Sequence, residues 1–61
     1  MRTKTLYAEN TNALEKALEN ITNNFPCFIN RKLIEMNYSE IEIRAREEDV
    51  ASIERILASL V

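Results

Sequence analysis

A chain of 61 residues has room for one domain with a modest core, so we expect a single domain over residues 1–61. Its only cysteine, Cys27, excludes an intrachain disulfide, and the absence of histidine leaves too few ligands for a structural zinc site. Domains of this size usually need such a support, and association with another chain is the one that remains. The net charge of −2 gives no strong field to attract nucleic acid.

The composition, 46% hydrophobic and 30% charged, is typical of a folded protein rather than a disordered one. The residues after Met1 lack the apolar run of a signal peptide, and no stretch approaches the roughly 20 apolar residues of a membrane span. We therefore expect a folded cytoplasmic protein that does not enter a membrane.

Residues 2–9 alternate in polarity and are rich in Thr and Tyr, which predicts a half-buried strand. The segment 10–12 can cap a helix, and Glu15, three residues after Asn12, approximates a capping box. Apolar residues then recur at helical spacing: Leu14, Ala17, Leu18, Ile21 and Phe25. Pro26 ends this helix.

An apolar trio at residues 27–29 leads to a second strand from about residue 31 to 36. Its register stays open, because Leu33 and Ile34 are adjacent and cannot both face a core. Residues 37–39 predict a tight turn, in which Asn37 would tolerate a positive φ. The third strand is the clearest, since residues 40–46 alternate between charged and apolar side chains.

The acidic residues 47–49 suit a helix N-terminus, and a buried stripe follows them. The stripe consists of Val50, Ile53, Ile56, Leu57 and Leu60. The element order β-α-β-β-α predicts an α+β fold with a three-stranded antiparallel sheet, the third strand in the middle and two helices packed on one face. This arrangement is the ferredoxin-like split βαβ without its last strand, which leaves residues 2–9 at an unpaired sheet edge.

Catalytic chemistry has few candidates in this chain. Without histidine there is no ordinary general base near neutral pH, and Cys27 has no histidine to activate it. Glu40 and Glu42 share a strand face, where two like charges are typical of solvated surface. No glycine is present for a phosphate-binding loop. We expect neither an enzyme nor a bound cofactor or metal.

Basic residues of the sheet suggest a nucleic-acid surface. Arg44 and Arg46 are expected to project from the same outer face of the sheet, along which a phosphate backbone could lie. Lys4 and Tyr7 lie on the flanking first strand, where the tyrosine could stack on a base. Further cations on the flanking strands are Arg2, Arg31 and Lys32. The alternative interpretation is an ordinary solvated face of mixed charge, because glutamates are interspersed among these cations.

The last helix has an unusual side opposite its apolar stripe. We call it the outer patch, and it consists of Ala51, Ser52, Arg55, Ala58 and Ser59. Side chains this small would let a partner helix approach closely, and Arg55 could bind a carboxylate. The alternative is that small residues merely occupy an exposed helix face.

The end of the chain resembles the KEOPS-complex small dimerisation subunit, or CTAG, family. That family has an isoleucine-rich strand ending in Ala, then Asp-Leu, and later Leu-Arg-Ala and Leu-Asn-Ser. The matching residues here are Ala45, Asp49, Val50, Ile53, Leu57 and Ser59. Glu54 stands where the family has Arg, Ala58 where it has Asn, the stretch from Ala45 to Asp49 is about two residues longer, and the hairpin lacks the usual Gly.

This resemblance covers the last third of the chain, and its departures favour a divergent paralogue. It implies a non-catalytic subunit that pairs with a second copy or a related subunit. It also implies docking on the larger ATPase-like protein that makes threonylcarbamoyladenosine in tRNA, with tRNA reached through the complex. The main hypothesis is thus a protein-interaction subunit, and the alternative is a small RNA- or DNA-binding domain. A ligand-binding domain of the ACT type is a third, weaker hypothesis, because its fourth strand and glycines are missing.

Overall fold

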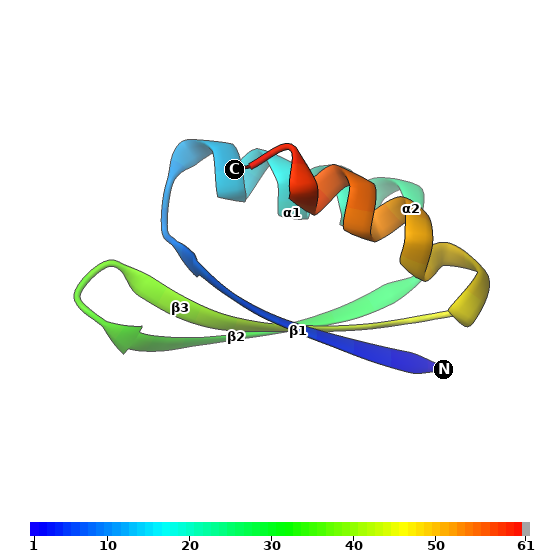
Figure 1. The fold of residues 1–61 in the computed structure, drawn as a ribbon, viewed down its shortest axis with the longest axis horizontal. Coiled ribbons are helices and arrows are strands. Elements are labelled where there is room, and N and C mark those ends of the chain that lie inside the picture. Colours follow the sequence, from blue (N-terminus) through cyan, green and yellow to red (C-terminus); the bar gives the residue numbers. More distant parts are fainter. Residues whose placement is uncertain (61) are drawn as a thin grey trace.

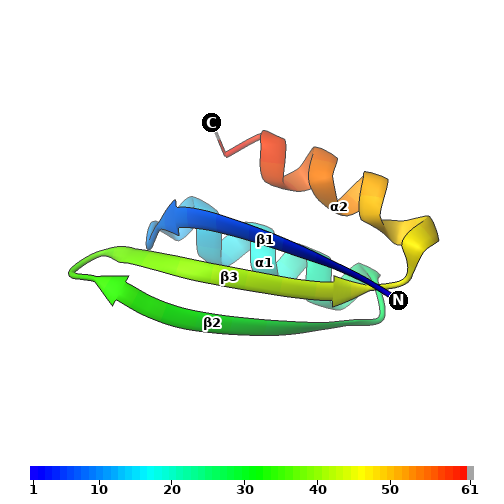
Figure 2. The same cartoon turned by 60° about the horizontal axis from the view of Figure 1, so that its bottom comes forward.

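The computed structural model describes residues 1–60 and has the element order β-α-β-β-α. The elements are β1 (Arg2–Glu9), α1 (Asn12–Asn24), β2 (Cys27–Glu35), β3 (Tyr38–Ala45) and α2 (Glu47–Ala58). The strands form one antiparallel sheet in the order β1-β3-β2, with β3 in the middle (Figure 2). Both helices lie on the same face of this sheet and leave the other face open (Figure 1). The predicted α+β fold is confirmed.

Strand β3 supplies the sheet side of the core because its side chains alternate strictly between two environments. The four that face the helices, Ser39, Ile41, Ile43 and Ala45, are almost completely buried. Those between them are charged or partly exposed. A central strand with one apolar and one polar face lies at the boundary between core and solvent. A shift of either neighbour by one residue would turn that neighbour's side chains to the opposite face of the sheet.

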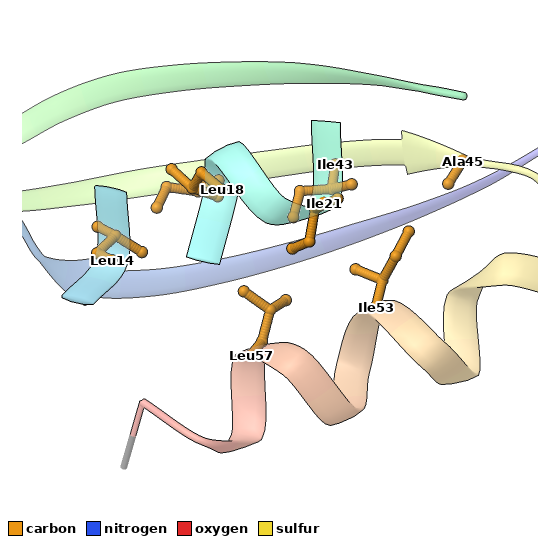
Figure 3. Packing of buried hydrophobic residues seen from close by; sticks show 8 residues of the cluster. Leu14, Leu18, Ile21, Ile43, Ala45, Ile53 and Leu57 are labelled. Atoms are coloured by element: carbon orange, nitrogen blue, oxygen red, sulfur yellow. The ribbon is translucent and has the colours of Figure 1, made fainter. Parts of the chain in front are cut away.

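The helices complete the core from above the sheet. In Figure 3, Ile21 of α1 lies beside Ile43 of β3 and faces Ile53 of α2, while Leu57 of α2 points toward α1 nearer to Leu14. The predicted stripes of both helices are correct in their centres, while Phe25, Ile56 and Leu60 at the margins remain partly exposed. Burial of such stripes supplies most of the stability of helices this short.

The cap of α1 lies within the predicted segment 10–12, but the predicted capping box is wrong. Thr11 is the N-cap residue, and its Oγ1 accepts a hydrogen bond of 3.1 Å from the backbone N–H of Leu14. Asn12 is instead the first helical residue, so Glu15 does not complete a capping box with it.

The β2–β3 hairpin differs from the prediction in the start of β2, the position of the turn and the backbone conformation of Asn37. Strand β2 starts at Cys27 rather than near residue 31, and the turn consists of Met36 and Asn37, with Tyr38 already in β3. The pairing register shifts between Leu33 and Glu35, so Ile34 has no paired residue on β3. The irregularity interrupts the alternation of side chains at the adjacent residues Leu33 and Ile34. No residue among 1–60 has a positive φ, so that expectation for Asn37 was wrong.

Candidate functional site

Titratable side chains are dispersed over the domain. Among residues 1–60 no group of three or more His, Cys, Asp or Glu side chains could hold a metal ion. Partial burial, and then the negative charge of Asp49, raise the pKa of the Cys27 thiol. A thiol with a raised pKa is a weak nucleophile at neutral pH, because the thiolate is the reactive form.

The open sheet face carries the outward side chains of all three strands in four cross-strand rows. The rows, written β1–β3–β2, are Thr3–Arg44–Phe28, Thr5–Glu42–Asn30, Tyr7–Glu40–Lys32 and Glu9–Tyr38–Glu35. Four glutamates and two cations give this face a formal charge of −4 + 2 = −2. Two of its aromatic rings are strongly exposed, Tyr7 by 56% and Phe28 by 70%.

The structure does not bring the four predicted nucleic-acid residues together. Tyr7 and Arg44 lie on the open sheet face. Lys4 lies on the helix face, opposite the buried Ile43. Tyr7 is three residues later in the same strand, and residues at this spacing point to opposite sides of a sheet. Its Nζ is 3.7 Å from Oε1 of Glu54 on α2. The prediction that Lys4 and Tyr7 share a surface was wrong.

Arg46 is also not part of the sheet. It is the N-cap residue of α2, and its Nε donates a hydrogen bond of 2.9 Å to Oδ2 of Asp49. This hydrogen bond and the charge of Asp49 raise the pKa of the guanidinium. Oε1 of Glu48 lies 3.4 Å from the same Nε. The charge of Arg46 is thus largely compensated within the first turn of α2.

Strand alternation places two other predicted cations on the helix face. Arg2 lies opposite Ala45 and Arg31 opposite Ile41. Nη1 of Arg31 is 2.6 Å from Oε1 of Glu15 on α1, which compensates its charge. Lys32 and Arg44 are left as the cations of the open sheet face.

All five residues of the outer patch are exposed, and they lie on the side of α2 away from the core. Ser59 also terminates the helix, since its Oγ donates a hydrogen bond of 2.7 Å to the carbonyl oxygen of Ile56. No carboxylate of residues 1–60 forms an ion pair with Arg55. The outer patch thus presents small side chains around one cation that the described part of the chain does not neutralise.

The third surface is the outer edge of β1. Among residues 1–60 no strand covers this edge, and Figure 2 shows α2 on the side of the domain where β1 lies. A hollow of about 350 Å³ opens beside β1, at the end of the domain where α2 finishes and α1 begins. Its apolar lining includes Leu6, Ala8, Leu14, Leu57 and Leu60. The sequence predicted the free edge but gave no sign of the hollow, which depends on how the two helices spread over the sheet.

No family model, no curated protein and no solved structure matches this chain.

Proposed function

We propose that this protein is a non-catalytic interaction subunit that pairs with a second copy of itself along β1. The observation that carries this proposal is the uncovered eight-residue edge strand with an apolar hollow beside it. An exposed edge of this length presents backbone donors and acceptors that a further strand can satisfy.

A two-fold axis makes the pairing of two β1 strands antiparallel, because the same edge of each copy then meets the other. Arg2 and Lys4 of both copies lie on the helix side of such a sheet and Glu9 on its open side. The pairing would give a sheet of six strands with all helices on one side. Leu60, half-buried at the rim of the hollow, would then contact the partner copy.

Docking on a larger protein is the second part of the proposal, and we place it on the outer patch. Support comes from the β-α-β-β-α order and from the resemblance of the last third of the chain to the KEOPS small subunit family. In this proposal the larger partner belongs to the machinery that makes threonylcarbamoyladenosine in tRNA, and the present chain contributes no catalytic group.

Nucleic-acid binding through the open sheet face has less support. Its carboxylates outnumber its cations by four to two, so a phosphate backbone would meet net repulsion there.

A matched pair of substitutions tests the β1 interface. Leu60→Glu places a charge at the rim of the hollow, and Ala58→Glu places the same charge two residues earlier on the outer patch. Sedimentation equilibrium should show a dimer for the wild type and for Ala58→Glu, and a monomer for Leu60→Glu. A monomeric wild type at 100 μM, or dissociation by Ala58→Glu alone, would exclude pairing along β1.

A further inference from the structure

We propose that the open sheet face binds a short, extended, arginine-rich segment of another protein. The open sheet face lies on the opposite side of the sheet from both helices, and therefore from the outer patch (Figure 1). It adjoins the β1 edge, since Tyr7, Glu9 and Tyr38 also line the hollow beside β1.

The four glutamates of the open sheet face exceed its own two cations, Lys32 and Arg44, which leaves a net negative charge. On the helix side and at the start of α2, Lys4, Arg31 and Arg46 each form an ion pair with a carboxylate. None of the four glutamates of the open sheet face forms an ion pair with a cation of residues 1–60. A basic partner would therefore gain attraction here without breaking an existing pair.

The aromatic rings are placed to assist in binding cations. Tyr38 lies directly between Glu9 and Glu35 in the cross-strand rows, and Tyr7 is its diagonal neighbour on β1. A shallow hollow of about 270 Å³ at this end of the hairpin is lined by Glu9, Glu35, Met36, Asn37 and Tyr38. A guanidinium can stack on an aromatic ring while it donates hydrogen bonds to a carboxylate, so this corner is suited to an arginine side chain.

The long, narrow shape of the face suits an extended segment. Strands of eight or nine residues are about 26 to 30 Å long. Three strands at about 4.8 Å spacing make the face roughly 14 Å wide. An extended segment of eight or nine residues has the same length as these strands. A second copy, with the same negative face, would be repelled, and so would a nucleic acid.

Fluorescence anisotropy with a labelled nine-residue polyarginine peptide tests the proposal at low salt. Glu40→Gln combined with Glu42→Gln removes two charges from the centre of the face and should weaken binding at least fivefold. The matched control is Glu19→Gln combined with Glu47→Gln, two exposed carboxylates on the helices, which should weaken binding less than twofold. Equal losses in the two double variants would show attraction by net charge alone and would overturn the proposal.

A second pair of variants tests the aromatic contribution without changing the charge. Tyr38→Phe keeps the ring and should bind the peptide as the wild type does, whereas Tyr38→Leu should lose at least threefold. In ¹⁵N spectra the peptide should shift the amides of the three strands and leave those of the outer patch unchanged. Shifts confined to the helices, no binding by the wild type, or tighter binding of a uridine RNA nonamer would each overturn the proposal.

Discussion

The hydroxyl group of Ser39 donates a hydrogen bond of 2.8 Å to Oδ1 of Asn10, which joins the start of β3 to the end of β1. Ser39 is 1% exposed and is the buried polar residue of the core. The backbone N–H of Asn10 donates a further hydrogen bond of 2.8 Å to the carbonyl oxygen of Asn37 in the hairpin turn. Asn10 therefore connects the β1–α1 loop with the hairpin while it satisfies a hydroxyl group that water cannot reach.

This relationship predicts unequal effects of two truncations. Asn10→Ala leaves the Ser39 hydroxyl buried without its partner, so we expect a loss of about 1–3 kcal/mol in the free energy of unfolding. Ser39→Ala removes the buried polar group itself and should cost about 1 kcal/mol or less. Urea denaturation followed by circular dichroism measures both. A larger loss for Ser39→Ala than for Asn10→Ala would contradict the assigned role of Asn10.

The core should be intolerant of cavities because it is small. Ile53 of α2 is completely enclosed, so Ile53→Ala should cost about 2–5 kcal/mol in the free energy of unfolding. Since a single core of this size supplies only about 3–5 kcal/mol, much of this variant should be unfolded at room temperature. Ile34→Ala, at a position that is 45% exposed, is the matched control and should cost less than about 1 kcal/mol. Similar denaturation midpoints for the two variants would show that α2 is not anchored as described.

The reactivity of Cys27 should depend on pH in a defined direction. Because burial and Asp49 raise the pKa of the thiol, the native chain should hold less thiolate at pH 8 than the urea-unfolded chain. We expect slower reaction with a disulfide reagent in the native state, with the pH–rate profile displaced to higher pH. The same displacement means that the native state retains the proton longer than the unfolded state. The stability linked to Cys27 is thus fully present below the unfolded pKa and is lost as the pH rises toward the native pKa.

Measurement of the unfolding midpoint between pH 7.5 and 10.5 checks the linkage, with Cys27→Ala as the reference that removes this titration. All other titratable groups are common to the two proteins, so the difference between the two curves isolates the thiol. An identical pH dependence would contradict the raised pKa.

The elements with strict periodicity could be predicted from the sequence. The alternation of residues 40–46 identified the buried face of β3, and the helical spacing of Leu14 and Ile21 identified the core side of α1. These patterns are local consequences of burial on one face. Strand β2 was placed too late because its first residues are all apolar, and a continuous apolar run hides the period that distinguishes a strand.

The surfaces were less predictable. The position of Lys4 could have been found from its odd spacing to Tyr7, which puts the two on opposite sides of one strand. The hydrogen bond between Asn10 and Ser39 joins residues 29 positions apart and has no local signal in the sequence. The compensation of Arg31 by Glu15 likewise depends on the placement of α1 over the sheet, which composition alone does not give.

The outer patch of α2 should be a docking surface for a larger protein. Val50, Ile53 and Leu57 turn toward the core, so the opposite side of the helix presents Ser52 and Arg55 to solvent. Ser52 is the better site for a steric block than Ser59, because Ser59 caps the helix and its replacement would disturb the fold. Ser52→Trp fills the space that a close partner helix would occupy, and Arg55→Glu reverses the charge offered to a carboxylate.

Both variants should keep the circular dichroism spectrum of the wild type and yet lose the partner that co-purifies with a tagged wild-type copy from its native cells. The matched controls lie on the exposed side of α1, where Asn23→Trp repeats the steric change and Lys16→Glu repeats the charge reversal. These controls should retain the partner, since they leave α2 untouched. If Ser52→Trp and Arg55→Glu both retain it as well, the outer patch is not the docking surface. The uncovered edge of β1 then becomes the place to look, and Leu60→Glu is the variant that should release the partner.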